Sequence, residues 1–501
     1  MSGDDLAGVD FPAGPDGRRS TSAVGRAVVA DALRPADAAG ARQAELEANW
    51  RTGYITHFRA LVEAGLGSAD TAASMAAAGL DSLYGQMLAA DHGGTQSRLA
   101  DLLTAGARRP LATVRVTGTA TAQEVLAVPY RGELLAGDAL ARRLAAWVTA
   151  GTVEPSFAAA IAEVACNPGW LHVPGKTVAV LGAGAEMGPA GVLLSWGARV
   201  MAIDLPRPAI WERLLTAARD GTGTLLVPVA KGPGQDAPAS LGAGLGADLA
   251  RHAGADLVAD VPAAADWLAA ADGPLVLGNY AYADGAGHVR VAAAVDVLTR
   301  RVQARRDDVA LAFLATPTDV FAVPADAVAH AERAYAARSA AVRLSGGSLR
   351  LLSRGRLLCP AYQPGASPGI NDSLFAQQGP NYALAKRLQR WRATVARRGG
   401  TTVSINIAPP TRTQSVLKNR ALAAAYAGAH RFGVEVFEPA TSQVLMAALL
   451  VHDLNVAGPP DGTHPWEDEA HAASHGGLWR MAYAPRSALS LAAALGFLSA
   501  R

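Results

Sequence analysis

A short apolar run that ends in a cluster of glycines limits what this chain can fold into more than any other feature. The run is TVAVLG (177–182), and it is followed by the helical pattern GPAGVLLSWG (188–197) and by ARVMAID (198–204). A nearly continuous apolar run of this length is typical of a strand buried on both faces of a parallel sheet. The order strand, glycine turn, helix and strand therefore predicts an α/β fold.

The same alternation continues toward the C-terminus. Further strands are expected at 224–229, 275–278, 309–315 and 402–407, and helices are expected to begin near residues 209, 287, 381 and 440. We predict a Rossmann-type, doubly wound parallel sheet over residues 171–460, with an insertion at about 324–379. The insertion precedes a helix that carries candidate catalytic residues, so we expect it to form part of the substrate wall or a lid, with an oligomer contact as the alternative.

The segments outside this region suggest separate units. Residues 1–36 have no sustained apolar periodicity, which predicts a poorly ordered arm. Residues 37–170 are expected to form an N-terminal, mainly helical domain, because Leu46, Trp50, Tyr54 and Phe58 recur at four-residue spacing and a second helix starts near Ser68. Residues 461–501 are expected to form a C-terminal tail.

Composition excludes several classes of protein. The 45 basic and 43 acidic residues leave a formal charge of only +2, which argues against a nucleic-acid partner. Two cysteines, Cys166 and Cys359, cannot form a disulfide framework. No signal-like or membrane-spanning apolar segment is evident, so we expect a cytoplasmic protein without a membrane partner. A homo-oligomer is left open by the sequence.

Histidines near the C-terminus are candidate metal ligands. His471 and His475 in THPWEDEAHAASHGG have the i, i+4 spacing that can chelate a metal on a helix. Because no third inward ligand is evident, we predict a polar tail and no metal.

The glycine turn itself predicts a bound dinucleotide. Backbone N–H groups at the start of a helix attract a pyrophosphate, and Asp204, 22 residues beyond Gly182, can accept hydrogen bonds from a ribose diol. This carboxylate favours NAD over NADP, although Arg207 could pair with a phosphate. The candidate cofactor-binding residues here are Gly182, Gly184, Glu186, Met187, Gly188 and Asp204. A turn that grips S-adenosylmethionine and a tight turn that binds nothing are the alternatives.

A tyrosine and a lysine in NYALAKRLQRW point to acid/base chemistry. Tyr382 and Lys386 are four residues apart, which places them on one face of the predicted helix. Lowering a tyrosine pKa from about 10 by about 3 units requires about 4 kcal/mol. A cation about 4 Å away supplies roughly that amount at an effective dielectric of about 20. Lys386 could therefore make Tyr382 a proton donor and acceptor; a buried tyrosine beside a solvated lysine is the plainer alternative.

Together the glycine turn and the Tyr382/Lys386 pair resemble the two signatures of the short-chain dehydrogenase/reductase family, in the family's order. The resemblance spans about residues 174–440 and implies hydride transfer between a nicotinamide cofactor, NAD or NADP, and a carbonyl or alcohol substrate. It also implies that Lys386 holds the nicotinamide ribose and that Asn279, in LVLGNYAYADG, lies near the cofactor. Thr411 or Thr413, in TTVSINIAPPTRT, would contact the nicotinamide carboxamide.

Some positions depart from the family pattern. The serine expected about a dozen residues before the tyrosine is missing, and the candidate replacements are Thr316 after the fifth strand and Ser373 in the insertion. The usual Pro-Gly step is Pro409-Pro410, and the helix from about Gly287 lacks the family's asparagine. A catalytically inactive dinucleotide-binding sensor or scaffold is therefore the main alternative, and a methyltransferase is the third.

Overall fold

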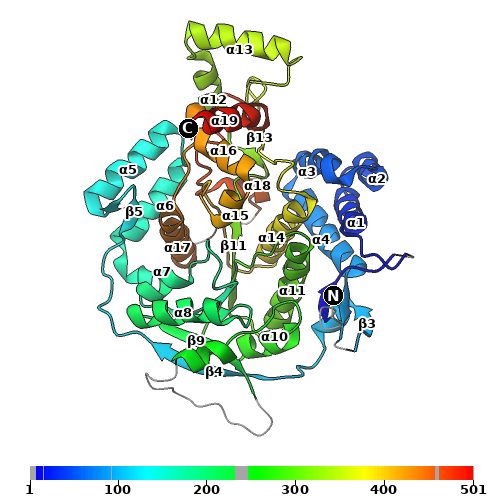
Figure 1. Cartoon of the computed structure of the whole chain (residues 1–501), viewed down its shortest axis with the longest axis vertical. Coiled ribbons are helices and arrows are strands. Elements are labelled where there is room, and N and C mark those ends of the chain that lie inside the picture. Colours follow the sequence, from blue (N-terminus) through cyan, green and yellow to red (C-terminus); the bar gives the residue numbers. More distant parts are fainter. Residues whose placement is uncertain are drawn as a thin grey trace.

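Six parallel strands and one antiparallel strand form the central sheet of the computed structural model (Figure 1), which describes residues 7–14, 16–91, 93–231, 246–456, 458 and 462–499. The strand order is β14-β11-β10-β7-β8-β9-β4. The strands are β4 (Leu111–Thr117), β7 (Thr177–Leu181), β8 (Arg199–Ile203), β9 (Thr224–Ala230), β10 (Leu275–Asn279), β11 (Val309–Ala315) and β14 (Val403–Ile407). The order runs outward from β7 in both directions, so the direction of winding reverses between β7 and β10.

Both faces of the sheet are buried. Along β7, Ala179 and Leu181 belong to one hydrophobic core, while Val178 and Val180 belong to the core on the opposite face. The first face is covered by α10 (Val261–Ala269), α11 (Ala286–Gln303) and α14 (Pro380–Arg398). The second is covered by α6 (Pro155–Cys166), α7 (Ala190–Ser195), α8 (Pro208–Asp220) and α17 (Pro439–Asn455). The predicted α/β class is confirmed: the sheet is mostly parallel and has helices on both faces.

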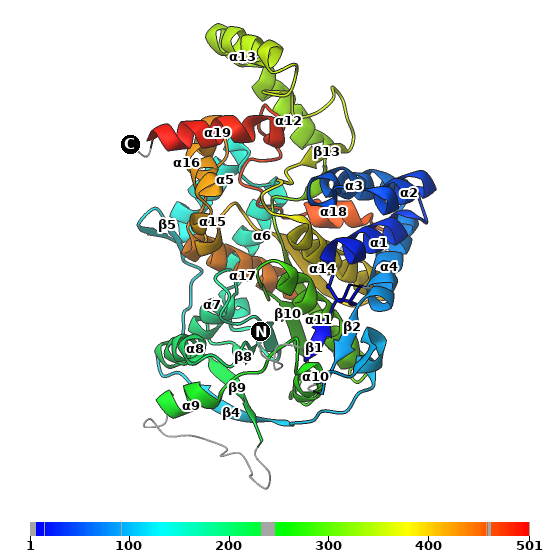
Figure 2. The same cartoon turned by 45° about the vertical axis from the view of Figure 1, so that its right-hand side comes forward.

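The N-terminal helices form an outer layer and not a domain of their own. They are α1 (Thr21–Leu33), α2 (Ala38–Leu46), α3 (Trp50–Gly65) and α4 (Ala69–Gln86), and α1, α3 and α4 pack against α14 (Figures 1 and 2). Trp50, Tyr54 and Phe58 lie in the same core as the residues of β10 and β11. The apolar stripe that predicted a separate domain over 37–170 is therefore buried against the sheet's own helices.

A second expectation for the N-terminal region is also corrected. Residues 1–36 are not a poorly ordered arm where they are described, because β1 (Gly8–Asp10) pairs with β2 (Leu88–Ala90) and α1 buries Val24, Val28 and Val29. β4 joins the central sheet by antiparallel pairing with β9. The remaining elements before β7 are β3 (Gln96–Arg98), η2 (Leu99–Leu103), β5 (Val128–Tyr130), β6 (Glu133–Leu135), α5 (Gly137–Ala150) and η3 (Pro168–His172).

The insertion and the C-terminal residues pack around a two-stranded antiparallel sheet. β12 (Val320–Val323) pairs antiparallel with β13 (Gly369–Asp372), and between them lie α12 (Ala325–Ala336) and α13 (Ala340–Leu352). α13 projects from the body of the molecule (Figure 1). The other elements are α9 (Gly246–His252), α15 (Gln414–Lys418), α16 (Arg420–Gly428), η5 (Ala429–Phe432), α18 (Pro465–Ala470) and α19 (Pro485–Ser499). α18 packs on β12 and β14 and α19 packs on α16, so residues 462–499 are an integral part of the fold instead of a tail.

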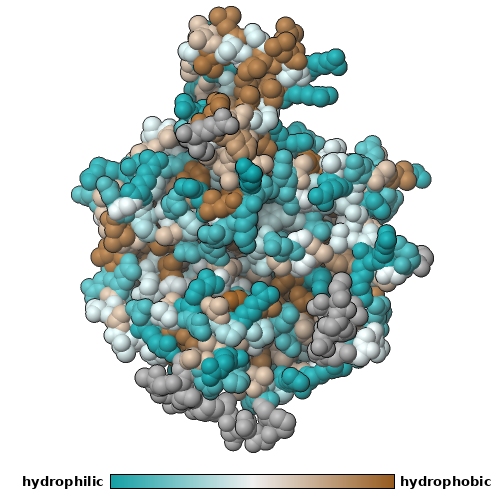
Figure 3. Space-filling view, in the orientation of Figure 1, coloured by the Kyte–Doolittle hydropathy of each residue, from teal (hydrophilic) through white to brown (hydrophobic). Residues whose placement is uncertain are grey.

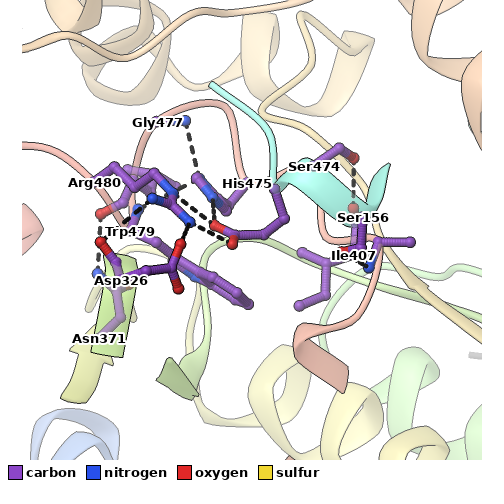
Figure 4. A network of polar contacts seen from close by, with 12 residues as sticks. Ser156, Asp326, Asn371, Ile407, Ser474, His475, Gly477, Trp479 and Arg480 are labelled. Carbon is purple, nitrogen blue, oxygen red and sulfur yellow. Dashed lines mark hydrogen bonds and ion pairs between the residues drawn. The ribbon is translucent and has the colours of Figure 1, made fainter. Parts of the chain in front are cut away.

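A buried ion network fixes the C-terminal residues to the rest of the chain. Arg480 pairs with Glu154 at 2.6 Å and with Asp326 at 2.5 Å (Figure 4). His475 contacts Glu154 at 2.8 Å and stacks on Trp479, with ring centroids 4.7 Å apart. The Arg480 and His475 contacts hold the pKa of Glu154 at about 2 despite its burial. His475 thus belongs to a structural network, and no group of three metal-ligating side chains occurs among the described residues.

No helix within the described ranges is long and apolar enough to cross a membrane. Cys166 and Cys359 are free thiols.

Candidate functional site

Several of the predicted residues meet at one edge of the sheet. β7 ends at Leu181, which pairs in register with Asn279 at the end of β10. Ala315 at the end of β11 pairs with Ile407 at the end of β14. The glycine turn, Asn279, Thr316 and the segment after β14 therefore leave the sheet at its carboxyl edge, where ligands bind in open parallel sheets.

The glycine turn requires its glycines for close packing. Gly182 has a φ of +79°, and a Cβ there would lie 2.6 Å from the Cα of Ala281 in the β10–α11 loop. A Cβ on Gly184 would lie 2.6 Å from the Cγ2 of Ile210. Side chains at these positions would displace the loop or α8. A Cβ on Gly188 would lie 3.1 Å from the carbonyl oxygen of Ala185, a tight contact.

Asp204 anchors this turn. Its Oδ2 accepts a hydrogen bond from the N–H of Gly184 at 2.8 Å, and its Oδ1 accepts one from the N–H of Leu205 at 2.7 Å. Burial raises the pKa of Asp204, against these two bonds and the nearby charges of Arg213 and Arg207. Asp204, the predicted ribose acceptor, thus also fixes the backbone of the turn. Each of its carboxylate oxygens retains one lone pair for a ligand.

The segment after β14 lies over the glycine turn. The N–H of Gln414 donates to Oε2 of Glu186 at 2.8 Å, and Gln443 donates to the Glu186 carbonyl oxygen at 2.5 Å. Thr411 is buried, and its hydroxyl bonds the Pro409 carbonyl oxygen and the Ser442 hydroxyl. These contacts leave Thr413, whose hydroxyl lies 2.9 Å from that of Ser415, as the more accessible of the two predicted threonines.

The rest of the turn serves packing. Met187 packs against the core beneath α7 and α17. α7 begins at Ala190 and has only six residues. Its dipole is therefore weaker than that of a long helix, and it attracts a pyrophosphate less strongly than expected. Asn279 is buried, and its Oδ1 accepts the N–H of Ala281 at 3.3 Å.

Tyr382 and Lys386 lie in the first half of α14, below the end of β11. Lys386 donates to the Leu314 carbonyl oxygen at 3.0 Å and to Oε1 of Gln389 at 3.2 Å. Burial lowers the pKa of Lys386 to about 8. Burial raises the pKa of Tyr382, and the group that lowers it is Thr316 and not Lys386. The expected direct effect of the lysine on the tyrosine pKa is therefore corrected.

A chain of polar groups leads away from Tyr382. Thr316, which lowers the pKa of Tyr382, has its hydroxyl 2.9 Å from that of Thr318, and Gln378 donates to the Thr318 hydroxyl at 2.7 Å. Ser373, the other predicted replacement for the missing serine, is fully buried and donates to Asn371 at 2.6 Å. Ser373 directly follows β13, and this contact with Asn371 occupies its hydroxyl, whereas Thr316 lowers the pKa of Tyr382.

His288 is a site residue that the sequence analysis missed. It is 1% exposed, and its ring forms a cluster with the rings of Tyr282 and Tyr382, with centroids 5.0 and 5.3 Å away. Neither ring nitrogen has a hydrogen-bond partner within the part of the chain that the structure describes. Burial, followed by the charge of Lys386, lowers the pKa of His288 to about 3, so the ring is neutral. The sequence signal available for His288 was its position in the first turn of the helix that follows β10.

An apolar cavity of about 50 Å³ lies beside Thr318. It is bordered by Phe375 from the insertion, Pro410 from the segment after β14 and Tyr426 from α16, and it extends to α19. Burial raises the pKa of Tyr426, and the charge of Tyr382 raises it further. The insertion thus contributes Phe375 to this wall, while α13 points away from it (Figure 1).

The lowered pKa of Lys386 predicts that the free energy of unfolding depends on pH. Because its pKa is about 8 in the folded chain and 10.5 in the reference state, the unfolded state binds more protons between these values. The free energy of unfolding should therefore gain a contribution that rises with pH from about 8 to about 10.5, by roughly 1.4 kcal/mol per unit of pKa difference.

Chemical denaturation of the wild type and of Lys386→Met at about pH 7.5, about 9 and about 10 measures this contribution. The wild type should gain stability relative to the variant as pH rises. A difference that is constant across the range would show that the Lys386 pKa is not lowered.

Neither a protein-family model, nor a curated protein, nor a solved structure matches this chain. The functional conclusion therefore depends on the geometry of the site and on the sequence motifs.

Proposed function

We propose that the chain is an oxidoreductase that transfers hydride between a nicotinamide cofactor, NAD or NADP, and a carbonyl or alcohol substrate. The observation that carries the proposal is the convergence of Tyr382, Thr316, Lys386 and the unpartnered His288 beside the point where the winding of the sheet reverses. The strand order 3-2-1-4-5-6, counted from β7, is that of Rossmann-type sheets, which bind dinucleotides at this reversal.

Two observations support a nicotinamide at this site. The unpaired nitrogens of His288, whose ring contacts that of Tyr382, leave a buried donor and acceptor with no partner among the described residues. Such a group is costly to bury unless a water molecule or ligand satisfies it. Lys386 supplies a cation one helical turn from Tyr382, where it would hold a ribose diol, and Gly184 and Asp204 would receive the adenosine half.

The reacting groups would act as follows. A bound nicotinamide would supply or accept the hydride. In carbonyl reduction the Tyr382 hydroxyl donates its proton to the substrate oxygen, and in alcohol oxidation it accepts that proton. Thr316 acts on the phenol by lowering its pKa, and the Thr316, Thr318 and Gln378 groups form a polar chain that leads away from the reacting atoms. The apolar wall at Phe375 and Tyr426 excludes water.

Nucleotide titration tests the proposal. The carboxylate of Asp204 repels a 2′-phosphate, so we expect NADH to bind about tenfold or more tightly than NADPH in a fluorescence titration. Asp204→Asn, which keeps the acceptor for the Gly184 N–H, should reduce this preference. Binding of S-adenosylmethionine in place of NADH would overturn the proposal, and tighter binding of NADPH would overturn only the cofactor preference.

His288 gives a prediction that separates function from packing. In His288→Leu the unpaired buried nitrogens disappear, so the free energy of unfolding should stay equal or rise, by up to roughly 1–3 kcal/mol. Turnover should fall at least about tenfold, because a polar contact at the site is lost. Denaturation and steady-state rates measure both, with His288→Asn as the variant that keeps a donor and an acceptor. Lower stability with an unchanged rate would assign His288 to packing alone.

One observation favours the dinucleotide-binding sensor as the second candidate. Burial raises the pKa of Tyr382, which keeps the phenol protonated near neutral pH and makes it a weaker acid. A sensor would bind NADH with the same residues and turn over no carbonyl or alcohol.

A further inference from the structure

Helix α13 (Ala340–Leu352) exposes an apolar face that the fold does not use. Gly346 is its only buried residue, and the helix stands clear of the body (Figure 1). Leu344, Leu351 and Leu352 are 75%, 82% and 82% exposed. Their i, i+7 and i+8 spacing places them on one side of the helix. The space-filling view shows apolar residues gathered at this projection (Figure 3).

This segment is also strongly basic. Residues 333–371 contain six arginines and no aspartate or glutamate, in a chain whose formal charge is only +2. Arg343, Arg350, Arg354 and Arg356 are exposed, and none forms an ion pair with another described residue. Arg343 and Arg350 each precede a leucine of the apolar face, so cationic groups flank that face along the helix.

We propose that α13, together with Arg354 and Arg356, docks the protein on an anionic lipid surface. A helix with leucines on one side and arginines beside them can lie in the membrane interface, with its apolar face among the acyl chains and its guanidinium groups at the headgroups. The negative potential of an anionic lipid surface, such as that of a cytoplasmic leaflet, attracts unpaired arginines. The docking is independent of the proposed oxidoreductase function.

The chemistry of α13 argues for lipid over the other occupants of an apolar face. A second copy of the chain would bring two sets of unpaired arginines together, which like charges oppose. Protein interfaces are enriched in aromatic side chains, and α13 contains only Ala, Val, Leu, Gly, Ser and Arg. Its side chains offer aliphatic surface and positive charge without groups that would specify a shaped partner.

Co-sedimentation with vesicles tests the proposal. The full chain is incubated with vesicles of phosphatidylcholine alone and with vesicles of phosphatidylcholine mixed with phosphatidylglycerol. We expect binding to the anionic vesicles, weakened as salt is raised, and about tenfold weaker binding to the neutral ones. Leu351→Ser/Leu352→Ser and Arg343→Gln/Arg350→Gln should each reduce binding to the anionic vesicles about tenfold.

A matched control is available on another helix. Leu46 at the end of α2 is also 75% exposed, and Leu46→Ser should leave vesicle binding unchanged. All the substituted side chains are exposed, so melting temperatures verify that each variant folds as the wild type does. Absence of binding to anionic vesicles, or equal loss in Leu46→Ser, would overturn the proposal. A dimer that Leu351→Ser/Leu352→Ser dissociates, without vesicle binding, would also overturn it and assign the face to a second copy.

Discussion

Replacing Tyr382 with Phe is expected to lower turnover by about 10² to 10⁴-fold while changing the Kd for NADH less than about twofold. General acid/base groups contribute rate factors of this size. The substitution removes only the hydroxyl, and the ring keeps its contacts with His288 and Tyr282. Rates with an active carbonyl substrate and a fluorescence titration with NADH measure the two quantities on the same preparation.

A second tyrosine serves as the control for this variant. Tyr335 on α12 packs against Tyr483 and lies outside the candidate site, so Tyr335→Phe should leave turnover and NADH affinity as they are. An unchanged rate in Tyr382→Phe would remove the acid/base assignment. A parallel loss of NADH affinity would instead give the hydroxyl a binding role.

The largest expected effect on stability comes from Arg390. On α14 it pairs with Asp319 at 2.8 Å and with Glu469 at 2.5 Å, and all three residues are buried. Arg387 is a second partner of Asp319, at 3.1 Å. Removing one member of a buried ion cluster leaves uncompensated charge in the core. Arg390→Met should therefore lower the free energy of unfolding by about 3 to 5 kcal/mol, measured by chemical denaturation.

The same helix provides the comparison. Arg398 pairs with Asp70 at the surface, so Arg398→Met should cost about 0 to 1 kcal/mol. In the Arg390→Met background, Asp319→Asn and Glu469→Gln should recover part of the loss, because they remove the stranded charges. Equal losses in Arg390→Met and Arg398→Met would contradict a buried cluster. Since Asp319 directly follows Thr318, this cluster also holds the hydroxyl groups of the site against α14.

The central strands could be predicted from the sequence because both of their faces are buried, which gives continuous apolar runs. TVAVLG predicted a strand over 177–182 and the structure has Thr177–Leu181; the second strand was expected to end at Asp204 and ends at Ile203. Ser68 was expected to start a helix, and its side chain accepts the N–H of Thr71 at 3.1 Å. In each case the signal lies in a few adjacent residues.

Other features depend on contacts between distant residues. α1 is rich in Ala and Val, and its helix is buried against α4, so its place in the fold depends on residues outside 1–36. β4 pairs with β9, which lies more than a hundred residues away along the chain, so no local pattern identifies that partner. The separate N-terminal domain was predicted because an apolar stripe does not tell which core it joins.

For the site, the local motifs were identified and the tertiary ones were missed. The Tyr382/Lys386 spacing and the Gly182–Asp204 turn could be read from the chain. His288 reaches Tyr382 from a different helix, and its lack of a partner is visible only in three dimensions. The surroundings of Thr316 and Ser373 likewise could not be predicted from the sequence. Only the structure shows that Ser373, next to β13, donates its hydroxyl to Asn371.

Transfer of deuterium tests the central claim most directly. The full chain is incubated with NADH deuterated at C4 and a panel of ketones and aldehydes, and the products are analysed by mass spectrometry. The proposed function predicts deuterium on the carbinol carbon of at least one product with the wild type, and about 10² to 10⁴-fold less with Tyr382→Phe. NADH binding without deuterium in any product would contradict hydride transfer and identify a nucleotide-binding protein without this activity.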